Sequence, residues 1–414
     1  MENQELIEHK LIRDENGKLL KSITNLVACF YIDENIKDLF TYNRFTGKDE
    51  YAKDFQWPGH PTIKEKGLTI SEKDEIYLQY YLSHNRNFEM PLEKIKNAIL
   101  EICDRSSYHP IQEYLNELEW DGEERLDYWL IKGCGVEDNI YTREVGRKWL
   151  TAAVSRVYNP GVKFDHVLVL EGKENIGKST ALRILGDQWF TDSVSLLQKE
   201  PDIVAKMSGN WIIELSEMHS VKMQVADFIK AFLSCQFDNQ RLTYRRDPQK
   251  FPRQSIFAGT SNSMSYLLDK DGNRRFWPVE CTVIDFDWLK DNRNQLFAEA
   301  KQRYQNNEKL FLEKEVYEMA KKFQKMRLGG DEILESEISQ FLIGKNETTL
   351  KEVLFQCLHH KSTDTNLSSQ QMIVGRILIK LGFEKKRRES SDGSKHKYIR
   401  ETIITQNKIM EEEE

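Results

Sequence analysis

The sequence predicts an α/β fold in which a parallel β-sheet is interleaved with helices, and three observations support this class. Continuous apolar runs occur at 167–170, 211–213 and 256–258, as is typical of strands buried on both faces. Apolar residues at helical spacing occur between these runs, at 181–185 and 227–233. The first run leads directly into a glycine-rich stretch and a helix start, so that strand, turn and helix follow in order.

The glycine-rich stretch at 172–179 has the pattern Gly-x-x-x-x-Gly-Lys-Ser. Glycines let backbone N–H groups surround a phosphate without Cβ clashes, and the helix start adds favourable partial charge. We expect Lys178 to reach the β- and γ-phosphates and the Ser179 hydroxyl to ligate Mg²⁺. The alternative, a chance glycine-rich turn, is disfavoured by the full pattern in this setting. The predicted ATP-binding residues are Gly172, Asn175, Ile176, Gly177, Lys178, Ser179 and Thr180.

Length and composition narrow the class of protein. At 414 residues the chain is long enough for two or three domains. No apolar run approaches the ~18 residues that span a bilayer, and the polar, acidic N-terminus argues against a signal peptide. Six scattered cysteines without a CxxC pair are typical of reduced thiols, so we expect a cytoplasmic protein with no membrane contact. The net charge of −7 means that nucleic-acid binding must come from local basic patches.

Breaks in the pattern predict three domains. Residues 1–134 form a mixed, mainly helical N-terminal region in which we find no catalytic constellation. Residues 135–330 contain the phosphate loop and form a P-loop ATPase domain, which ends at a Gly-Gly-Asp break. Residues 331–414 form a C-terminal domain of helices and a basic hairpin, followed by an acidic tail.

The second apolar run is followed by acidic residues at the position where a phosphate-loop enzyme needs them. One carboxylate there can hold Mg²⁺, and another can polarise the attacking water. Strand alternation puts Ile212 and Glu214 on one side, so Glu214 is the candidate metal-side acid and Glu217 the candidate base. Two solvated loop carboxylates are the plain alternative, and the division of roles between Glu214 and Glu217 stays open.

Polar residues further along the chain are candidates for phosphate chemistry. Asn262 follows the third apolar run, and an amide at a strand tip is suited to orient the hydrolytic water or the γ-phosphate. Arg274 and Arg275 follow a Gly-Asn turn before another predicted strand. An arginine there could reach the γ-phosphate of a neighbouring subunit and stabilise the transition-state charge. Surface arginines are common, so this prediction depends on the rest of the set.

A basic segment precedes the third apolar run. Five of the thirteen residues at 241–253 are Lys or Arg, and they are interleaved with Tyr244 and Phe251. This composition predicts a hairpin that follows a sugar-phosphate backbone and stacks bases. An exposed basic turn without a ligand is nearly as consistent with it. The candidate DNA-binding residues are Tyr244, Arg245, Arg246, Lys250 and Arg253.

The strongest local basic bias lies near the C-terminus. Residues 380–400 contain eight Lys or Arg against three acidic residues. Two helices followed by a basic hairpin are the arrangement of a winged-helix module, which places its second helix in a DNA groove. A plain solvated hairpin is the alternative. The candidate DNA-binding residues here are Lys385, Lys386, Arg387, Arg388, Lys395 and Lys397.

Taken in order, these motifs resemble the virulence-associated protein E family of phages and mobile elements, related to superfamily 3 helicases in the AAA+ class. The matching residues are 172–179, 211–217, 230–233, Asp238, Arg241, 244–246, 251–254, 259–262 and 272–279. The resemblance implies an AAA+-like core that hydrolyses ATP in a homo-oligomeric ring, commonly a hexamer, and moves on single-stranded DNA. In related ATPases the two acids are often adjacent, whereas Leu215 and Ser216 separate them here.

We therefore expect an ATP-dependent DNA helicase that acts in replication of a phage or mobile genetic element. A second hypothesis is an origin-binding replication initiator whose ATP switch controls assembly and which does not unwind DNA. It predicts tight binding of duplex DNA through residues 385–397. A third is a nucleotide-dependent regulatory switch without nucleic acid.

Overall fold

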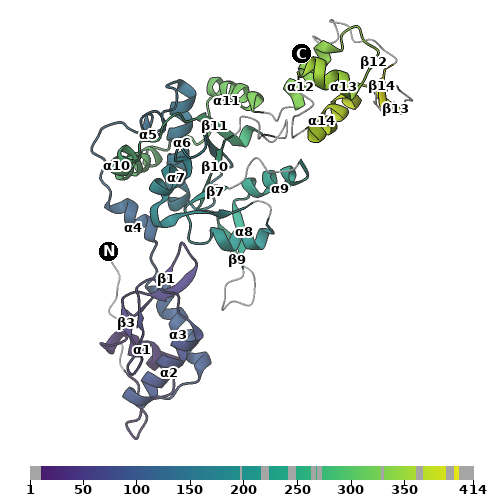
Figure 1. The fold of residues 1–414 in the computed structure, drawn as a ribbon. Helices are drawn as coiled ribbons and strands as arrows, with labels where there is room; N and C mark the ends of the chain where they lie inside the picture. Colours follow the sequence, from purple (N-terminus) through teal and green to yellow (C-terminus); the bar gives the residue numbers. More distant parts are fainter. Residues whose placement is uncertain are drawn as a thin grey trace.

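A five-stranded parallel sheet forms the centre of the molecule (Figure 1). The computed structural model describes residues 11–195, 198–215, 223–240, 249–262, 267, 273–327, 331–359, 367–387 and 396–400. The strands are β5 (Val167–Glu171), β6 (Phe190–Val194), β7 (Ile212–Leu215), β10 (Ile256–Ser261) and β11 (Phe276–Glu280). Their order is β11-β5-β10-β7-β6, and each neighbouring pair is parallel. The predicted α/β class with a parallel sheet is confirmed.

Helices cover both faces of this sheet. They are α4 (Pro110–Glu117), α5 (Trp129–Cys134), α6 (Ile140–Tyr158), α7 (Lys178–Gly186), α8 (Glu200–Met207), α9 (Met223–Ser234), α10 (Phe286–Gln305) and α11 (Lys314–Met326). In β5, Leu168 and Leu170 belong to the core shared with α6, α7 and α10. Val167 and Val169 belong to the core shared with α8 and α9. Because successive strand residues face opposite sides, a continuous apolar run is needed for a strand buried on both.

The ends of α6 are set by local sequence. The Asn139 side chain accepts the Thr142 N–H at 3.0 Å, and the Thr142 hydroxyl accepts the Asn139 N–H at 3.1 Å, which satisfies the first turn. The helix stops before Pro160, and Gly161 adopts a left-handed φ of +82°. In between, Trp149 donates to the Phe257 carbonyl of β10 at 2.8 Å and ties the helix to the sheet.

Residues 11–105 have an apolar core of their own. Buried side chains from all three of its helices, including Leu26, Leu78 and Ile95, make up this core. β1 pairs antiparallel with β2, and β3 pairs antiparallel with β4. The elements are α1 (Ile23–Ile32), β1 (Phe40–Asn43), β2 (Lys48–Tyr51), β3 (Phe55–Gln56), β4 (Ile63–Lys64), α2 (Glu72–Arg86) and α3 (Leu92–Arg105).

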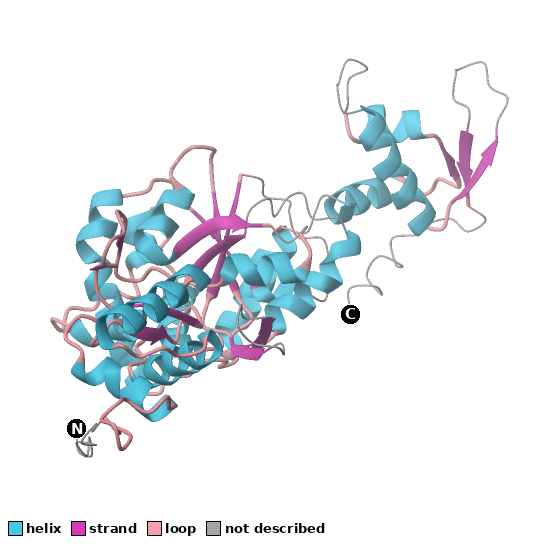
Figure 2. Cartoon of the chain, turned by 90° about the horizontal axis from the view of Figure 1, so that it is seen from below, coloured by secondary structure: helices cyan, strands magenta, loops and turns pink. Residues whose placement is uncertain are grey.

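The C-terminal part has a second small core and a three-stranded antiparallel sheet, β12-β14-β13. Its elements are α12 (Asp331–Phe341), β12 (Glu347–Thr348), α13 (Leu350–Glu352), a π-helical turn (Val353–Cys357), α14 (Leu367–Lys380), β13 (Glu384–Arg387) and β14 (His396–Ile399). Figure 2 shows this sheet well apart from the central one. Across the described residues, no helix has both the length and the apolar character to cross a membrane.

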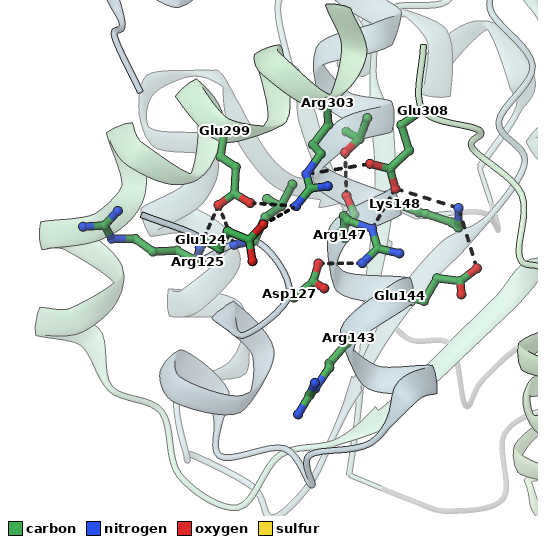
Figure 3. A network of polar contacts seen from close by, with 12 residues as sticks. Glu124, Arg125, Asp127, Arg143, Glu144, Arg147, Lys148, Glu299, Arg303 and Glu308 are labelled. Carbon is green, nitrogen blue, oxygen red and sulfur yellow. Dashed lines mark hydrogen bonds and ion pairs between the residues drawn. The ribbon is translucent and has the colours of Figure 1, made fainter. Parts of the chain in front are cut away.

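A network of charged side chains fastens the segment before α5 to α10 (Figure 3). Glu299 of α10 is fully buried, and its Oε2 accepts the backbone N–H groups of Arg125 and Leu126 at 2.7 and 2.8 Å. Arg303 donates to the other carboxylate oxygen at 3.4 Å. Further labelled members are Glu124, Asp127, Arg143, Glu144, Arg147, Lys148 and Glu308. One buried carboxylate thus satisfies two backbone donors of a loop.

We expect Glu299→Ala to lower the free energy of unfolding by about 2–4 kcal/mol, because it leaves two backbone donors without their acceptor. Glu299→Gln keeps an oxygen acceptor of similar volume and should lose less than half as much. Urea unfolding of both variants and the wild type measures the difference. Equal losses in the two variants would show that the acceptor role of Glu299 is not what stabilises the fold.

Candidate functional site: the loop after β5 and the strand ends beside it

The segment at 172–177 makes a turn that requires glycine at two positions. φ is +146° at Gly172 and +100° at Gly177, and Asn175 adopts a left-handed +62°. Residues with a Cβ rarely adopt positive φ, although Asn tolerates it better than most. A Cβ at Gly172 would lie 2.5 Å from the Cys281 carbonyl oxygen, and one at Gly177 would lie 2.3 Å from Phe286 Cζ. Both conformation and space therefore exclude larger residues.

The turn ends at the N-terminus of α7. Gly177 is the N-cap and Lys178 the first helical residue, so the unpaired N–H groups of the first turn face the loop. Thr180 is exposed in that turn. Ile176 is half-buried, with its Cδ1 2.8 Å from the position of a Cβ on Gly172. This geometry is suited to an anion such as a phosphate.

The Lys178 ammonium is held under the loop by three oxygen acceptors. It donates to the carbonyls of Gly172 and Lys173 at 2.9 and 2.7 Å and to Asn262 Oδ1 at 2.8 Å. The residue is buried, and burial lowers the pKa of the ammonium. A bound anion would oppose that effect, because an opposite charge nearby favours the protonated form.

Glu214 is the acidic group beside the loop. Its Oε1 accepts hydrogen bonds from Ser179 Oγ at 2.8 Å and Thr260 Oγ1 at 2.7 Å. Its Oε2 is buried and has no hydrogen-bond partner among the described residues. A buried carboxylate oxygen without a donor is costly, which points to a ligand that supplies positive charge or a proton donor.

These groups fit Mg²⁺ beside a bound phosphate. Magnesium takes oxygen ligands and is commonly held by one or two carboxylates together with substrate phosphates and water. Glu214 and Ser179 supply a carboxylate and a hydroxyl, 2.8 Å apart. No group of three or more His, Cys, Asp or Glu that could hold a metal alone is found in the part of the chain that the structure describes. Phosphate and water would therefore complete the coordination.

Strand pairing brings these residues together. β10 lies between β5 and β7, with Ala258 opposite Glu214 and Ser261 opposite Glu171. The carboxyl ends of the three strands therefore deliver the loop, Glu214 and Asn262 to the same edge of the sheet. Glu217, the predicted base, lies outside the described residues.

The two candidate arginines lie at the opposite edge. They precede β11, which runs parallel to β5 with Phe276 opposite Val167. Five residues of strand, roughly 16 Å, therefore separate them from the phosphate loop of the same chain. Arg274 is exposed. Arg275 is mostly buried, donates to Ser234 Oγ at 2.9 Å and lies 3.5 Å from Asp165.

The hairpin expected from the basic segment is formed by β8 (Phe237–Gln240) and β9 (Gln249–Pro252). Lys250 is exposed on β9, whereas Tyr244, Arg245 and Arg246 lie outside the described residues. The expectation for Arg253 has to be corrected. Its guanidinium is almost fully buried, pairs with both oxygens of Asp238 and donates to the Phe232 carbonyl at 2.6 Å. A guanidinium satisfied in this way holds the base of the hairpin and does not face solvent.

The C-terminal basic residues lie on the small antiparallel sheet. Lys385 and Lys386 are exposed on β13, and Lys397 of β14 is paired with Glu347. Arg387 ends β13, and its side chain is outside the described part, as are Arg388 and Lys395. Figure 2 shows this small sheet apart from the central sheet that carries the loop after β5.

A buried ion pair at the start of the loop was not expected from the sequence. Arg327, at the end of α11, donates to both oxygens of Glu171, with Nη2 at 2.6 Å from Oε2. The Arg327 carbonyl accepts the Leu267 N–H at 3.0 Å. Thr260 was likewise missed as a partner of Glu214. No local pattern links residues so far apart in the chain, so only the folded arrangement identifies them.

The fold and the loop define an α/β protein with a P-loop-like glycine-rich turn after the first strand of a parallel sheet. The model of the virulence-associated protein E-like domain matches residues 115–328, and the chain belongs to this family. The resemblance seen in the motifs is thereby confirmed.

Two further comparisons add little. A search of the curated proteins found no match. Among solved structures, an apo structure of the NrS-1 C terminal region has a TM-score of 0.43 and 12% identity and covers 87% of this chain and 95% of that one. An A form apo structure of that region has a TM-score of 0.42 at 11% identity, with the same coverage. Neither identity nor TM-score is high enough to transfer a fold or a function.

We expect Gly177→Ala to weaken binding of ATP with Mg²⁺ roughly 10- to 100-fold, since φ of +100° and the Phe286 ring both oppose a Cβ. Gly122→Ala is the matched control, because Gly122 also has a positive φ but open space around it. Isothermal titration with ATP measures the affinities, and thermal unfolding checks the fold. Equal affinity of Gly177→Ala and wild type would exclude this loop as the phosphate site.

Proposed function

We propose that the protein is an ATP hydrolase that binds ATP with Mg²⁺ at residues 172–180 and drives movement on single-stranded DNA. The observation that carries the proposal is the convergence of Lys178, Asn262, Ser179 and Glu214 at one edge of the sheet. This set contains a phosphate cation, a polar amide, a hydroxyl and a carboxylate, which are the groups that phosphoryl transfer requires.

Each side chain has a role in the proposed reaction. Lys178 leaves its carbonyl acceptors and binds the β- and γ-phosphate oxygens, while the loop N–H groups hold the phosphate chain. Ser179 and Glu214 hold Mg²⁺, which when bound neutralises charge on the phosphates. Asn262 orients the γ-phosphate or the attacking water. Glu217 accepts the proton of that water as general base.

Arg274 acts from a neighbouring subunit in this proposal. An arginine aimed at the γ-phosphate stabilises charge in the transition state and is worth a factor of about 10³–10⁵ in rate. Its exposure and its place at the edge of the sheet away from its own loop support action in trans. Such action requires a neighbouring copy, and we propose a homo-oligomeric ring, most simply a hexamer. Arg275 donates to Ser234 and so positions the turn that carries Arg274.

The proposed biological role is replication of a phage or mobile genetic element, as a DNA helicase. Membership of the virulence-associated protein E-like family supports it. The β8–β9 hairpin with exposed Lys250 supports contact with single-stranded DNA, and the C-terminal helices and antiparallel sheet support a winged-helix-like module. We also propose the division into parts at 1–134, 135–330 and 331–414, in which α4 and α5 at the end of the first part pack on the central domain.

A second candidate is an ATP-switched replication initiator that binds an origin and does not unwind. The observation that favours it is the pair of exposed lysines, Lys385 and Lys386, on a separate C-terminal sheet. Filter binding of duplex DNA beside strand displacement separates the two functions. Tight, salt-sensitive duplex binding without displacement favours the initiator.

Lys178→Ala should reduce ATP hydrolysis at least roughly 100-fold, because it removes the cation that meets the transferring phosphate. Single-stranded DNA should stimulate hydrolysis by the wild type and have no effect on the variant. Phosphate release with and without oligothymidylate measures both. Wild-type hydrolysis that single-stranded DNA leaves unchanged would contradict a DNA motor, although the nucleotide site would stand.

Mixing two inactive variants tests the shared site. Lys178→Ala and Arg274→Ala should each lose hydrolysis alone. A mixture should recover part of it, since some interfaces then combine an intact Lys178 with an intact Arg274 from the neighbour. Arg275→Ala mixed with Lys178→Ala serves as comparison, because Arg275 is engaged within its own chain. A mixture of the first pair that stays inactive while rings still form would exclude Arg274 as a residue acting in trans.

A further inference from the structure

A small cleft of about 50 Å³, partly open to solvent, lies between the N-terminal part and the base of the β8–β9 hairpin. The turn between β1 and β2 contributes Phe45 and Thr46, and the end of α8 contributes Met207 and Ser208. Phe251 and Gln254, on either side of the end of β9, line it from the hairpin. Figure 1 shows β1 reaching up to α8 and β9 at this point. The cleft is smaller than a site that encloses a small molecule, so a ligand here would lie partly outside it.

Polar contacts join the walls of the cleft at its edges. Ser208 Oγ donates to the Thr46 carbonyl at 3.3 Å. Gln254 Oε1 lies 2.6 Å from His109 Nε2. Gln254 Nε2 donates to the Arg44 carbonyl at 3.4 Å. The two parts of the chain are therefore held at a defined separation, and the cleft is a feature of their junction.

The two charged side chains in the lining form an ion pair with each other. Asp238 and Arg253 both border the cleft and are paired through two hydrogen bonds. Burial lowers the pKa of His109, so this neighbour carries no charge at neutral pH. An anionic or cationic group would therefore gain little inside. The lining suits an uncharged group that can contact two aromatic rings.

Two phenylalanine rings border the cleft from opposite parts of the chain. Phe45 is half-buried and lies against the His109 ring, with centroids 5.6 Å apart. Phe251 is half-buried on β9. Arg44, Lys48 and Lys250, which flank these rings in sequence, are exposed. Aromatic faces with exposed cations beside them are the combination by which proteins bind single-stranded nucleic acid, stacking bases while cations meet phosphates.

We infer that this cleft receives a base of the single-stranded DNA that the hairpin binds. The inference rests on the proposed DNA binding and goes beyond it, because it gives the N-terminal part a direct role in holding the strand. The base stacks on the Phe45 and Phe251 rings at the open side of the cleft, and the phosphates stay outside near the exposed lysines.

Binding of fluorescein-labelled oligothymidylate, measured by anisotropy, tests the inference. Phe45→Ala and Phe251→Ala should each raise the Kd roughly 5- to 100-fold, the cost of one lost stacking contact. Phe45→Leu, which keeps apolar volume without a ring, should behave like Phe45→Ala. The salt dependence of binding should stay unchanged, because stacking releases no counterions. Tyr80→Ala, at an exposed aromatic of α2, is the matched control and should bind as wild type does.

Photo-crosslinking with iodouracil-substituted oligonucleotide gives a direct readout. The crosslinked peptides should contain Phe45 or Phe251. Wild-type affinity in both alanine variants, or crosslinks confined to other peptides, would overturn the inferred role of the cleft. DNA binding elsewhere on the protein would still stand. If the wild type does not bind single-stranded DNA, both the proposed function and the inferred role of the cleft are wrong. Thermal unfolding of each variant ensures that lost binding is not lost folding.

Discussion

Parallel, in-register pairing of β10 with β5 on one side and β7 on the other determines where the candidate catalytic groups lie. All three strands point their carboxyl ends to one edge, so the loop after β5, Glu214 and Asn262 meet there. The pairing in turn depends on apolar side chains that fill both faces of the sheet. A register shift of one residue in β7 would turn Glu214 to the opposite face and separate it from Ser179.

The candidate site contains two buried charged side chains, and one of them lacks a full set of hydrogen-bond partners. Lys178 has three oxygen acceptors, whereas Glu214 has one oxygen paired and one without a donor in the described part of the chain. Such a pair of opposite, buried charges suits a ligand that brings negative phosphates and a cation together. The Glu171–Arg327 ion pair anchors α11 at the residue before the loop. Breaking one partner of a buried pair costs about 3–5 kcal/mol, so this anchor also holds the strand end in place.

Because the strands are parallel, different functional groups lie at the carboxyl ends and at the amino ends of the strands. The candidate nucleotide-binding groups lie at the carboxyl edge, while Arg274, the β8–β9 hairpin and the cleft with Phe45 lie toward the amino edge. In the proposed function, one subunit would therefore bind the nucleotide and its neighbour would supply the arginine. In the proposed ring, β10 connects the two functions directly, because it starts beside Gln254 and ends at Asn262.

The sequence by itself determined the parallel α/β class, the loop at 172–179 and the family, because these are encoded in local patterns: continuous apolar runs, glycines at fixed spacing and the order of motifs. The alternation of side chains along a strand also predicted that Glu214 faces the side of the sheet where Mg²⁺ is expected. Only the tertiary structure decided that Thr260 joins Glu214, that Arg327 pairs with Glu171, and that Arg253 is buried against Asp238. These contacts depend on burial and on residues distant in the chain, and composition cannot tell a buried, paired arginine from an exposed one.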